Sequence, residues 1–128
     1  MSDIKTIAVE NAPKAIGPYA QGIVANGFLF TAGQVPLDPA TMKLVEGDIA
    51  AQTHRVFDNL EAILAGAGAT LAGVVKATVY LMDMGDFAKM NEVYAARFGS
   101  HRPARSTVQV AALPAGARLE IDLVSTLK

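Results

Sequence analysis

The chain contains no cysteine, and this absence removes several kinds of chemistry at once. Without a thiol there is no disulfide, no thiolate metal site, no iron–sulfur cluster and no cysteine nucleophile. The first six residues also lack the basic segment and apolar stretch of a secretory signal. No apolar run approaches the length that crosses a bilayer. We therefore expect a cytoplasmic protein with no membrane partner.

An excess of charge of one sign is missing as well. Eleven basic and twelve acidic residues give a net charge of -1, so bulk electrostatics does not favour nucleic acid as a partner. The apolar fraction of 52% and the mean hydropathy of +0.31 are high for a chain with a small surface to cover. Oligomers hide such a surplus in their interfaces. We predict one domain over residues 1–128, a homo-oligomer and a small-molecule ligand.

The amino-terminal third of the chain has the pattern of a β-hairpin followed by a loop. Two short apolar stretches, 22–25 and 28–31, are joined by Asn26-Gly27, which is the strongest short signal for a hairpin turn. The segment 36–40 combines two prolines with an aspartate and predicts an exposed loop.

The middle of the chain predicts a helix and then a strand. Apolar residues recur at helical spacing after Asp48, a plausible N-cap, until Gly66 and Gly68 end the pattern. The segment 74–81 is dense in β-branched residues and predicts a largely buried strand. This order suggests a βαβ crossover.

The carboxyl-terminal part predicts a second helix and two more strands. Asp86 is a plausible cap for this helix, and Gly99 is its natural stop. Its apolar face contains Phe87, Met90, Tyr94 and Phe98. The predicted strands are 106–111 and 119–126. The fold class is therefore α+β, a mixed sheet with two helices on one face, and we expect the other face to pack in the oligomer.

Arg105 is the first candidate for a functional residue, because it stands just before a predicted strand. A rigid scaffold can hold a guanidinium there, at the edge of a cleft. An arginine cannot act as a base, but it grips a carboxylate through two parallel hydrogen bonds. The alternative is an ordinary surface arginine in a weak ion pair.

Glu120 is the second candidate, since it interrupts an otherwise apolar strand between Leu119 and Ile121. Alternation places it on the same face as Asp122, so a solvated stripe is one interpretation. The other is a carboxylate in a partly desolvated cleft, whose raised pKa lets it deprotonate a water. The second interpretation requires a nearby cation.

Two further polar residues have both a structural and a functional interpretation. Tyr19 follows Gly17-Pro18, so its phenol projects from a constrained turn and can contact a polar ligand or the core. Asn91 lies on the second predicted helix, either exposed or oriented toward a ligand.

The remaining patterns give no cofactor and no metal. His54 and His101 have no companion at ligand spacing, which argues against a metal site. The run 66–68 follows a helix, whereas a dinucleotide-binding loop precedes one, so no nucleotide cofactor is implied.

Taken together, these residues resemble the RidA/YjgF family signature. The central match is Pro103-Ala104-Arg105-Ser106, followed by Val108, Ala111, Leu113 and Leu119-Glu120-Ile121. Upstream matches are Asn11-Ala12-Pro13, Ile16-Gly17-Pro18-Tyr19, Gly33-Gln34, Asn59-Leu60, Val75-Lys76 and Asn91, so the resemblance covers nearly the whole chain.

The resemblance implies a homotrimer of a chorismate-mutase-like fold, with sites in clefts between subunits. It implies hydrolysis of 2-iminobutanoate and 2-iminopropanoate to 2-oxo acids and ammonia, without a cofactor. By the same resemblance, Arg105 binds the substrate carboxylate and Glu120 holds the attacking water. Tyr19, Asn91 and main-chain groups near Gly33 and Thr107 line the cleft.

The sequence departs from the family pattern at two positions and leaves two other functions open. Ala32 and Thr107 stand where well-characterised deaminases often carry serine and cysteine, so the preferred substrate is open. One alternative is a module that binds a 2-oxo acid without turnover. The other is a ribonuclease or translation inhibitor that uses Arg102, Arg105 and Arg118, which the net charge of -1 disfavours.

Overall fold

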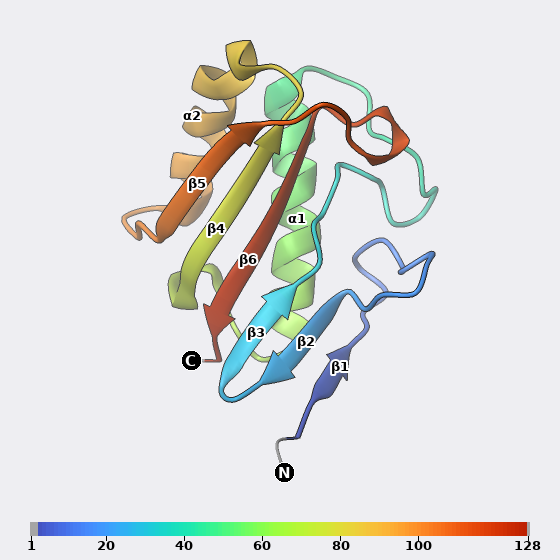
Figure 1. The fold of residues 1–128 in the computed structure, drawn as a ribbon, viewed down its shortest axis with the longest axis vertical. Coiled ribbons are helices and arrows are strands. Elements are labelled where there is room, and N and C mark those ends of the chain that lie inside the picture. Colours follow the sequence, from blue (N-terminus) through green and yellow to red (C-terminus); the bar gives the residue numbers. More distant parts are fainter. Residues whose placement is uncertain (1–2, 128) are drawn as a thin grey trace.

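The computed structural model describes residues 3–127 and contains one mixed sheet and two α-helices (Figure 1). The strands are β1 (Lys5–Ile7), β2 (Gly22–Ala25), β3 (Phe28–Thr31), β4 (Val74–Leu81), β5 (Ala104–Gln109) and β6 (Leu119–Thr126). The helices are α1 (Ile49–Gly66) and α2 (Phe87–Phe98). The order across the sheet is β1-β2-β3-β6-β4-β5. The α+β class, the mixed sheet and the two helices are thereby confirmed.

The topology refines the expected βαβ crossover. Helix α1 does connect β3 to β4, but the last strand of the chain, β6, lies between them and pairs antiparallel with both. The neighbouring parallel pair is β4 and β5, which are connected through α2. Residues distant in sequence therefore meet at the centre of the sheet.

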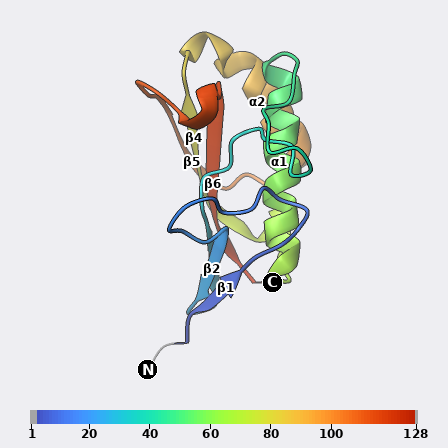
Figure 2. The same ribbon diagram turned by 90° about the vertical axis from the view of Figure 1, so that its right-hand side faces the viewer.

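Both helices cover the same face of the sheet, and Figure 2 shows them as one layer beside it. The core between the two layers is apolar, and its fully buried side chains include Leu29, Phe57, Leu60, Ile63, Leu81, Ile121 and Leu123. We call the face toward the helices the covered face and the opposite one the open face. The open face carries Phe28 and Phe30, which are 38% and 46% exposed.

The ends of the elements confirm one predicted cap and correct two other predictions. Asp48 caps α1, because its Oδ1 accepts a hydrogen bond from Ala51 N at 2.9 Å. Asp86 precedes α2 but makes no capping bond, since its carboxylate accepts instead from Arg118 at 2.8 Å. Strand β5 runs over 104–109, not 106–111, because its partner β4 ends where Leu81 pairs with Gln109.

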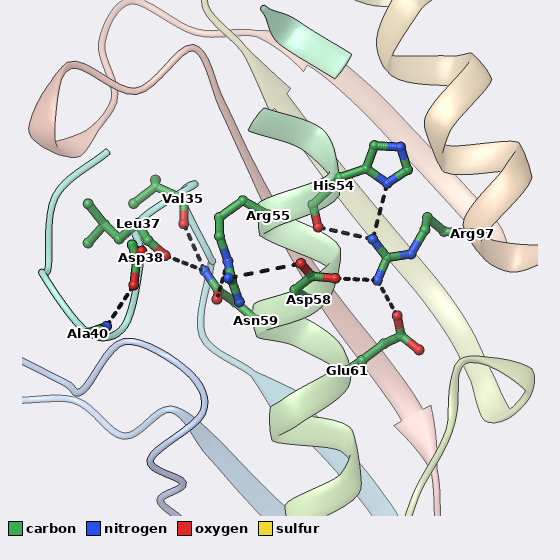
Figure 3. A network of polar contacts seen from close by, with 10 residues as sticks. All are labelled: Val35, Leu37, Asp38, Ala40, His54, Arg55, Asp58, Asn59, Glu61 and Arg97. Atoms are coloured by element: carbon green, nitrogen blue, oxygen red, sulfur yellow. Dashed lines mark hydrogen bonds and ion pairs between the residues drawn. The ribbon is translucent and has the colours of Figure 1, made fainter. Parts of the chain in front are cut away.

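An ionic cluster joins the two helices (Figure 3). The Arg97 guanidinium of α2 donates to Asp58 Oδ1 at 2.8 Å, to the Glu61 carboxylate and to the His54 carbonyl at 3.0 Å. It also lies over the Phe57 ring, 5.4 Å from its centroid. These contacts fix α2 against α1 and thereby the side chains that α2 presents to the sheet. Within residues 3–127, neither helix has the length and hydropathy to span a membrane.

Buried Asn59 of α1 holds the loop that follows β3. Its Nδ2 donates to the Leu37 carbonyl at 3.0 Å and to the Val35 carbonyl at 3.4 Å, and its Oδ1 accepts from Arg55 (Figure 3). Upstream, Gln34 exchanges two backbone hydrogen bonds with Ile121 of β6. The loop is therefore tied to both layers, directly after Gly33.

Candidate functional site

Apart from Tyr19, the predicted site residues lie in two separate groups, one on each face of the sheet. On β6 the side chains alternate, so that Leu119, Ile121 and Leu123 enter the core while Glu120 and Asp122 point to the open face. On β5, Arg105 pairs with Ala77 and Thr107 with Val79, both buried core residues of β4. Side chains of paired residues share a face. Arg105 therefore belongs to the covered face and Glu120 to the open face.

Gly33 is in direct contact with the Glu120 side chain. A Cβ atom on Gly33 would lie 2.3 Å from Glu120 Oε2 and 2.6 Å from its Cδ, closer than any real contact. The two hydrogen bonds between Gln34 and Ile121, at 2.9 and 3.1 Å, hold the backbone in this position. A larger residue at position 33 would therefore displace the Glu120 carboxylate from this place.

The surroundings of Glu120 disfavour its charged form. Burial raises the pKa of its carboxyl above the ordinary value, and the negative charge of Asp122 raises it further. Asp122 accepts a hydrogen bond from the Tyr80 hydroxyl at 3.0 Å, and Tyr80 pairs with Glu120 across the strands. No basic side chain among residues 3–127 forms an ion pair with Glu120. The required cation is therefore not supplied by the described part of the same chain.

Arg105 is held by three residues of α2. Its Nη1 donates to Asn91 Oδ1 at 2.7 Å. Its guanidinium lies 4.6 Å from the centroid of the Tyr94 ring and 5.4 Å from that of Phe87. Aromatic faces attract a guanidinium without neutralising it. The cation is oriented, yet no carboxylate between residues 3 and 127 pairs with it.

A cavity of about 370 Å³ opens beside Arg105. Its lining residues are Asn91, Tyr94, Ala95, Arg102, Pro103 and Arg105, none of them acidic. Tyr94 is only 5% exposed, and its buried hydroxyl has no hydrogen-bond partner within the described chain. Burial raises the pKa of this phenol, and the nearby charges of Arg105 and Arg102 oppose that rise. An anion with hydrogen-bonding atoms is the ligand chemistry that suits these groups.

The other predicted site residues take different positions. Asn91 is the oriented partner of Arg105, not an exposed polar residue. Thr107 lies two residues beyond Arg105 on the same face, and its buried Oγ1 has no partner within residues 3–127. Tyr19 is 53% exposed and lines a different, mostly apolar hollow beside β1. The structure thus unites Arg105 with Asn91 and Glu120 with Gly33, and leaves Tyr19 apart from both pairs.

Sequence reasoning missed the role of Tyr94. Helical spacing assigned it to the apolar face of α2, and its ring does pack against Phe57 and Phe98. One signal in the sequence could have revealed this role. Tyr94 stands three residues after Asn91, and this spacing brings both side chains to the same side of the helix.

Three other basic side chains, Arg118, His54 and His101, have partners in the fold. Arg118 donates to Asp86, so the three arginines proposed for a phosphate-binding patch do not form one set of free cations. His101 contacts the Val74 carbonyl at 2.6 Å, and His54 contacts Arg97. No cluster of three metal-ligating side chains occurs within residues 3–127.

Most of the sequence matches the model of a known protein family. The family model described as Endoribonuclease L-PSP covers residues 9–127. The chain therefore belongs to this family, also called RidA/YjgF, and the resemblance found in the sequence is confirmed.

Individual relatives match over nearly their full length. A RutC family protein of Pyrococcus horikoshii is 54% identical over 121 residues, which covers 94% of this chain and 96% of the relative. The 2-iminobutanoate/2-iminopropanoate deaminase of Escherichia coli K12 is 45% identical over 124 residues, with coverages of 94% and 96%. Among solved structures, E. coli TdcF with bound serine has a TM-score of 0.90 at 38% identity, and the match covers 95% and 98% of the two chains.

Proposed function

We propose that this protein hydrolyses 2-imino acids, such as 2-iminobutanoate and 2-iminopropanoate, to 2-oxo acids and ammonia. The observation that carries the proposal is the Arg105 guanidinium, oriented by Asn91 and two aromatic rings at the wall of a cavity without acidic residues. A carboxylate is the group that such a guanidinium binds best. The 45% identity to a deaminase of this specificity supports the same substrate class.

The chemistry requires little beyond orientation and proton transfer. Arg105 holds the substrate carboxylate, and Glu120 accepts a proton from a water that adds to the C=N carbon. The nitrogen takes up a proton, the C–N bond breaks, and ammonia leaves as the carbonyl of the 2-oxo acid forms. The raised pKa of Glu120 brings this carboxylate closer to the pKa at which a general base works best near neutral pH.

The site is completed between copies of the chain, in a homotrimer that we assign to the cytoplasm. Because one sheet separates Arg105 from Glu120, one subunit supplies Arg105, Asn91 and the main chain at Thr107, while its neighbour supplies Glu120, Gly33 and Tyr19. Two observations support this arrangement. Glu120 has no cation partner among residues 3–127, and the exposed Phe28 and Phe30 of the open face provide apolar surface for an interface.

The first test is the release of ammonia and 2-oxo acid when purified protein is added to a threonine dehydratase reaction. We expect acceleration by the unmodified chain, and loss of that acceleration in Arg105→Ala. The matched control is Lys89→Ala, which removes an exposed positive charge from α2 outside the cavity. Unchanged turnover in Arg105→Ala would refute the assignment of the anchor.

The shared site has its own test, which mixes two inactive variants. Arg105→Ala and Glu120→Gln are combined, unfolded and refolded together, so that mixed trimers form. If the site lies between subunits, some sites in mixed trimers pair an intact Arg105 with an intact Glu120, and activity returns. If both residues acted within one chain, no mixture would regain activity.

A second candidate function is binding of a 2-oxo acid or amino acid without turnover. The solved TdcF structure, which holds serine, favours this possibility. Glu120→Gln separates the two functions, because the amide keeps shape and hydrogen bonding but accepts no proton. Slower hydrolysis with retained binding supports catalysis, whereas hydrolysis at an equal rate makes Glu120 a spectator. Cleavage of RNA is less well supported, and it would show the steep salt dependence of phosphate binding.

A further inference from the structure

The cavity beside Arg105 contains more positive charge than one carboxylate needs. The chain has five arginines, and three of them, Arg55, Arg97 and Arg118, form ion pairs with aspartate or glutamate. The other two, Arg102 and Arg105, have no carboxylate partner within residues 3–127. Both line the same cavity. The unpaired arginines of the described chain are thus gathered at one place.

Arg102 is held in position by neutral groups. Its Nη1 donates to the carbonyl of Gly99, just beyond α2, and to the carbonyl of His101 at 2.9 Å. These two bonds restrain the guanidinium at the cavity wall, but they leave its charge uncompensated. A restrained and unpaired guanidinium loses less side-chain entropy when it binds an anion.

Tyr94 adds a buried polar group to the wall of this cavity. Its hydroxyl is buried without a hydrogen-bond partner in the described chain, a costly state for a polar atom. Arg102 and Arg105 line the same cavity as Tyr94, and the Arg105 guanidinium lies 4.6 Å from the centroid of its ring. Asn91 completes the wall with its amide.

From this arrangement we infer that the protein accepts 2-imino dicarboxylic acids, with Arg105 binding the carboxylate next to the imine and Arg102 binding the second one. The inference rests on the proposed imine hydrolysis and specifies its substrate class. The reaction balances as before: water adds at the imine carbon, the C–N bond breaks, and ammonia and a 2-oxo dicarboxylate are released. The second carboxylate is unchanged, so Arg102 determines specificity and takes no part in the chemistry.

The turnover experiment compares two imines of different charge. Amino-acid oxidases generate 2-iminopropanoate from alanine and 2-iminosuccinate from aspartate, and the remaining imine is trapped as a semicarbazone. The measured quantity is the ratio of kcat/KM for the dicarboxylate to that for the monocarboxylate. We expect Arg102→Gln to lower this ratio about tenfold, the loss typical of one charge-assisted hydrogen bond. Arg102→Lys keeps the charge and should restore part of the ratio, while Lys89→Gln should leave it unchanged.

A binding experiment decides the inference even if no imine is hydrolysed. Calorimetry measures the affinities of the unmodified protein and of Arg102→Gln for 2-oxoglutarate and 2-oxobutanoate, both stable in water. We expect Arg102→Gln to weaken 2-oxoglutarate binding more than 2-oxobutanoate binding. Equal effects on both ligands, or an unchanged kcat/KM ratio, would overturn the role of Arg102 and leave imine hydrolysis standing. Failure to hydrolyse either imine, with the expected binding difference, would overturn the hydrolysis alone.

Discussion

The two faces of the sheet are built from the same strands, yet they differ in what they contact. On β6, Leu123 is 1% exposed beneath the helices, and Val124, the next residue, lies on the open face. The covered face is closed by α1 and α2, whereas the open face presents Phe28, Phe30, Tyr80 and Asp122 to whatever lies outside the chain. One face stabilises the subunit, and the other is available for assembly.

The same division separates the two predicted catalytic residues. Arg105 is oriented from the covered face by α2, and Glu120 is set on the open face against Gly33. Because they lie on opposite faces of the sheet, these two side chains do not meet within one subunit. This separation supports the proposal that the site is shared between two copies of the chain.

The largest effect is expected from a pair of neighbouring substitutions on β6. Leu123→Ala leaves a cavity in the core and should lower the free energy of unfolding by about 2 to 5 kcal/mol. Val124→Ala should cost less than half as much in subunit stability, since the helices do not cover it. Urea denaturation at several protein concentrations separates subunit unfolding from dissociation. Equal losses at both positions would contradict the difference between the faces.

The next effect concerns assembly through the open face. Phe30→Ser removes an aromatic ring that is 46% exposed and should raise the concentration needed for assembly at least roughly tenfold. Size-exclusion chromatography with light scattering over a dilution series measures this shift. Lys43→Ser, in an exposed loop away from the sheet, is the control. An unchanged mass at every dilution would show that copies do not meet on this face.

A smaller effect is expected on the covered side, where Arg97 joins the two helices. Its side chain is only 18% exposed and contacts Asp58 and Glu61 at once. Arg97→Ala should lower the free energy of unfolding by about 1 to 2 kcal/mol, more than a typical surface pair. The difference from the unmodified chain should shrink at high salt. A loss no larger than that of Lys89→Ala would mean that the cluster contributes nothing to stability.

The smallest effect has a definite sign and comes from Glu120. Its pKa in the folded state is raised above the unfolded value of 4.5, so the folded state holds this proton more tightly. Stability therefore falls as the pH rises between the two pKa values, and the penalty persists at neutral pH. At concentrations too low for assembly, Glu120→Gln should raise Tm at neutral pH, with the gain vanishing below about pH 4. A lower Tm at neutral pH would show that the carboxylate stabilises the fold.

Local sequence patterns predicted most of the elements, although not β1, and they predicted the neighbours of each strand poorly. The Asn26-Gly27 turn, the Asp48 cap and the alternation around Glu120 were confirmed, because each depends on residues a few positions apart. The insertion of β6 between β3 and β4 was not predicted, since it joins segments far apart along the chain. Asp86 failed as a cap for the same reason: a distant arginine binds its carboxylate.

The candidate site shows the same difference between what local patterns predict and what contacts between distant residues decide. The sequence by itself determined the fold class, the helix and strand periods and the family. It also made Arg105 and Glu120 candidates by their positions, and the family resemblance then gave them roles. Only the tertiary structure decided that these two residues face opposite sides of one sheet, that Tyr94 and Asn91 orient Arg105, and that Arg102 shares its cavity. Periodicity assigns a side chain to a face of its own element. Which groups meet across that face depends on strand order and helix packing, which are set by contacts between distant residues.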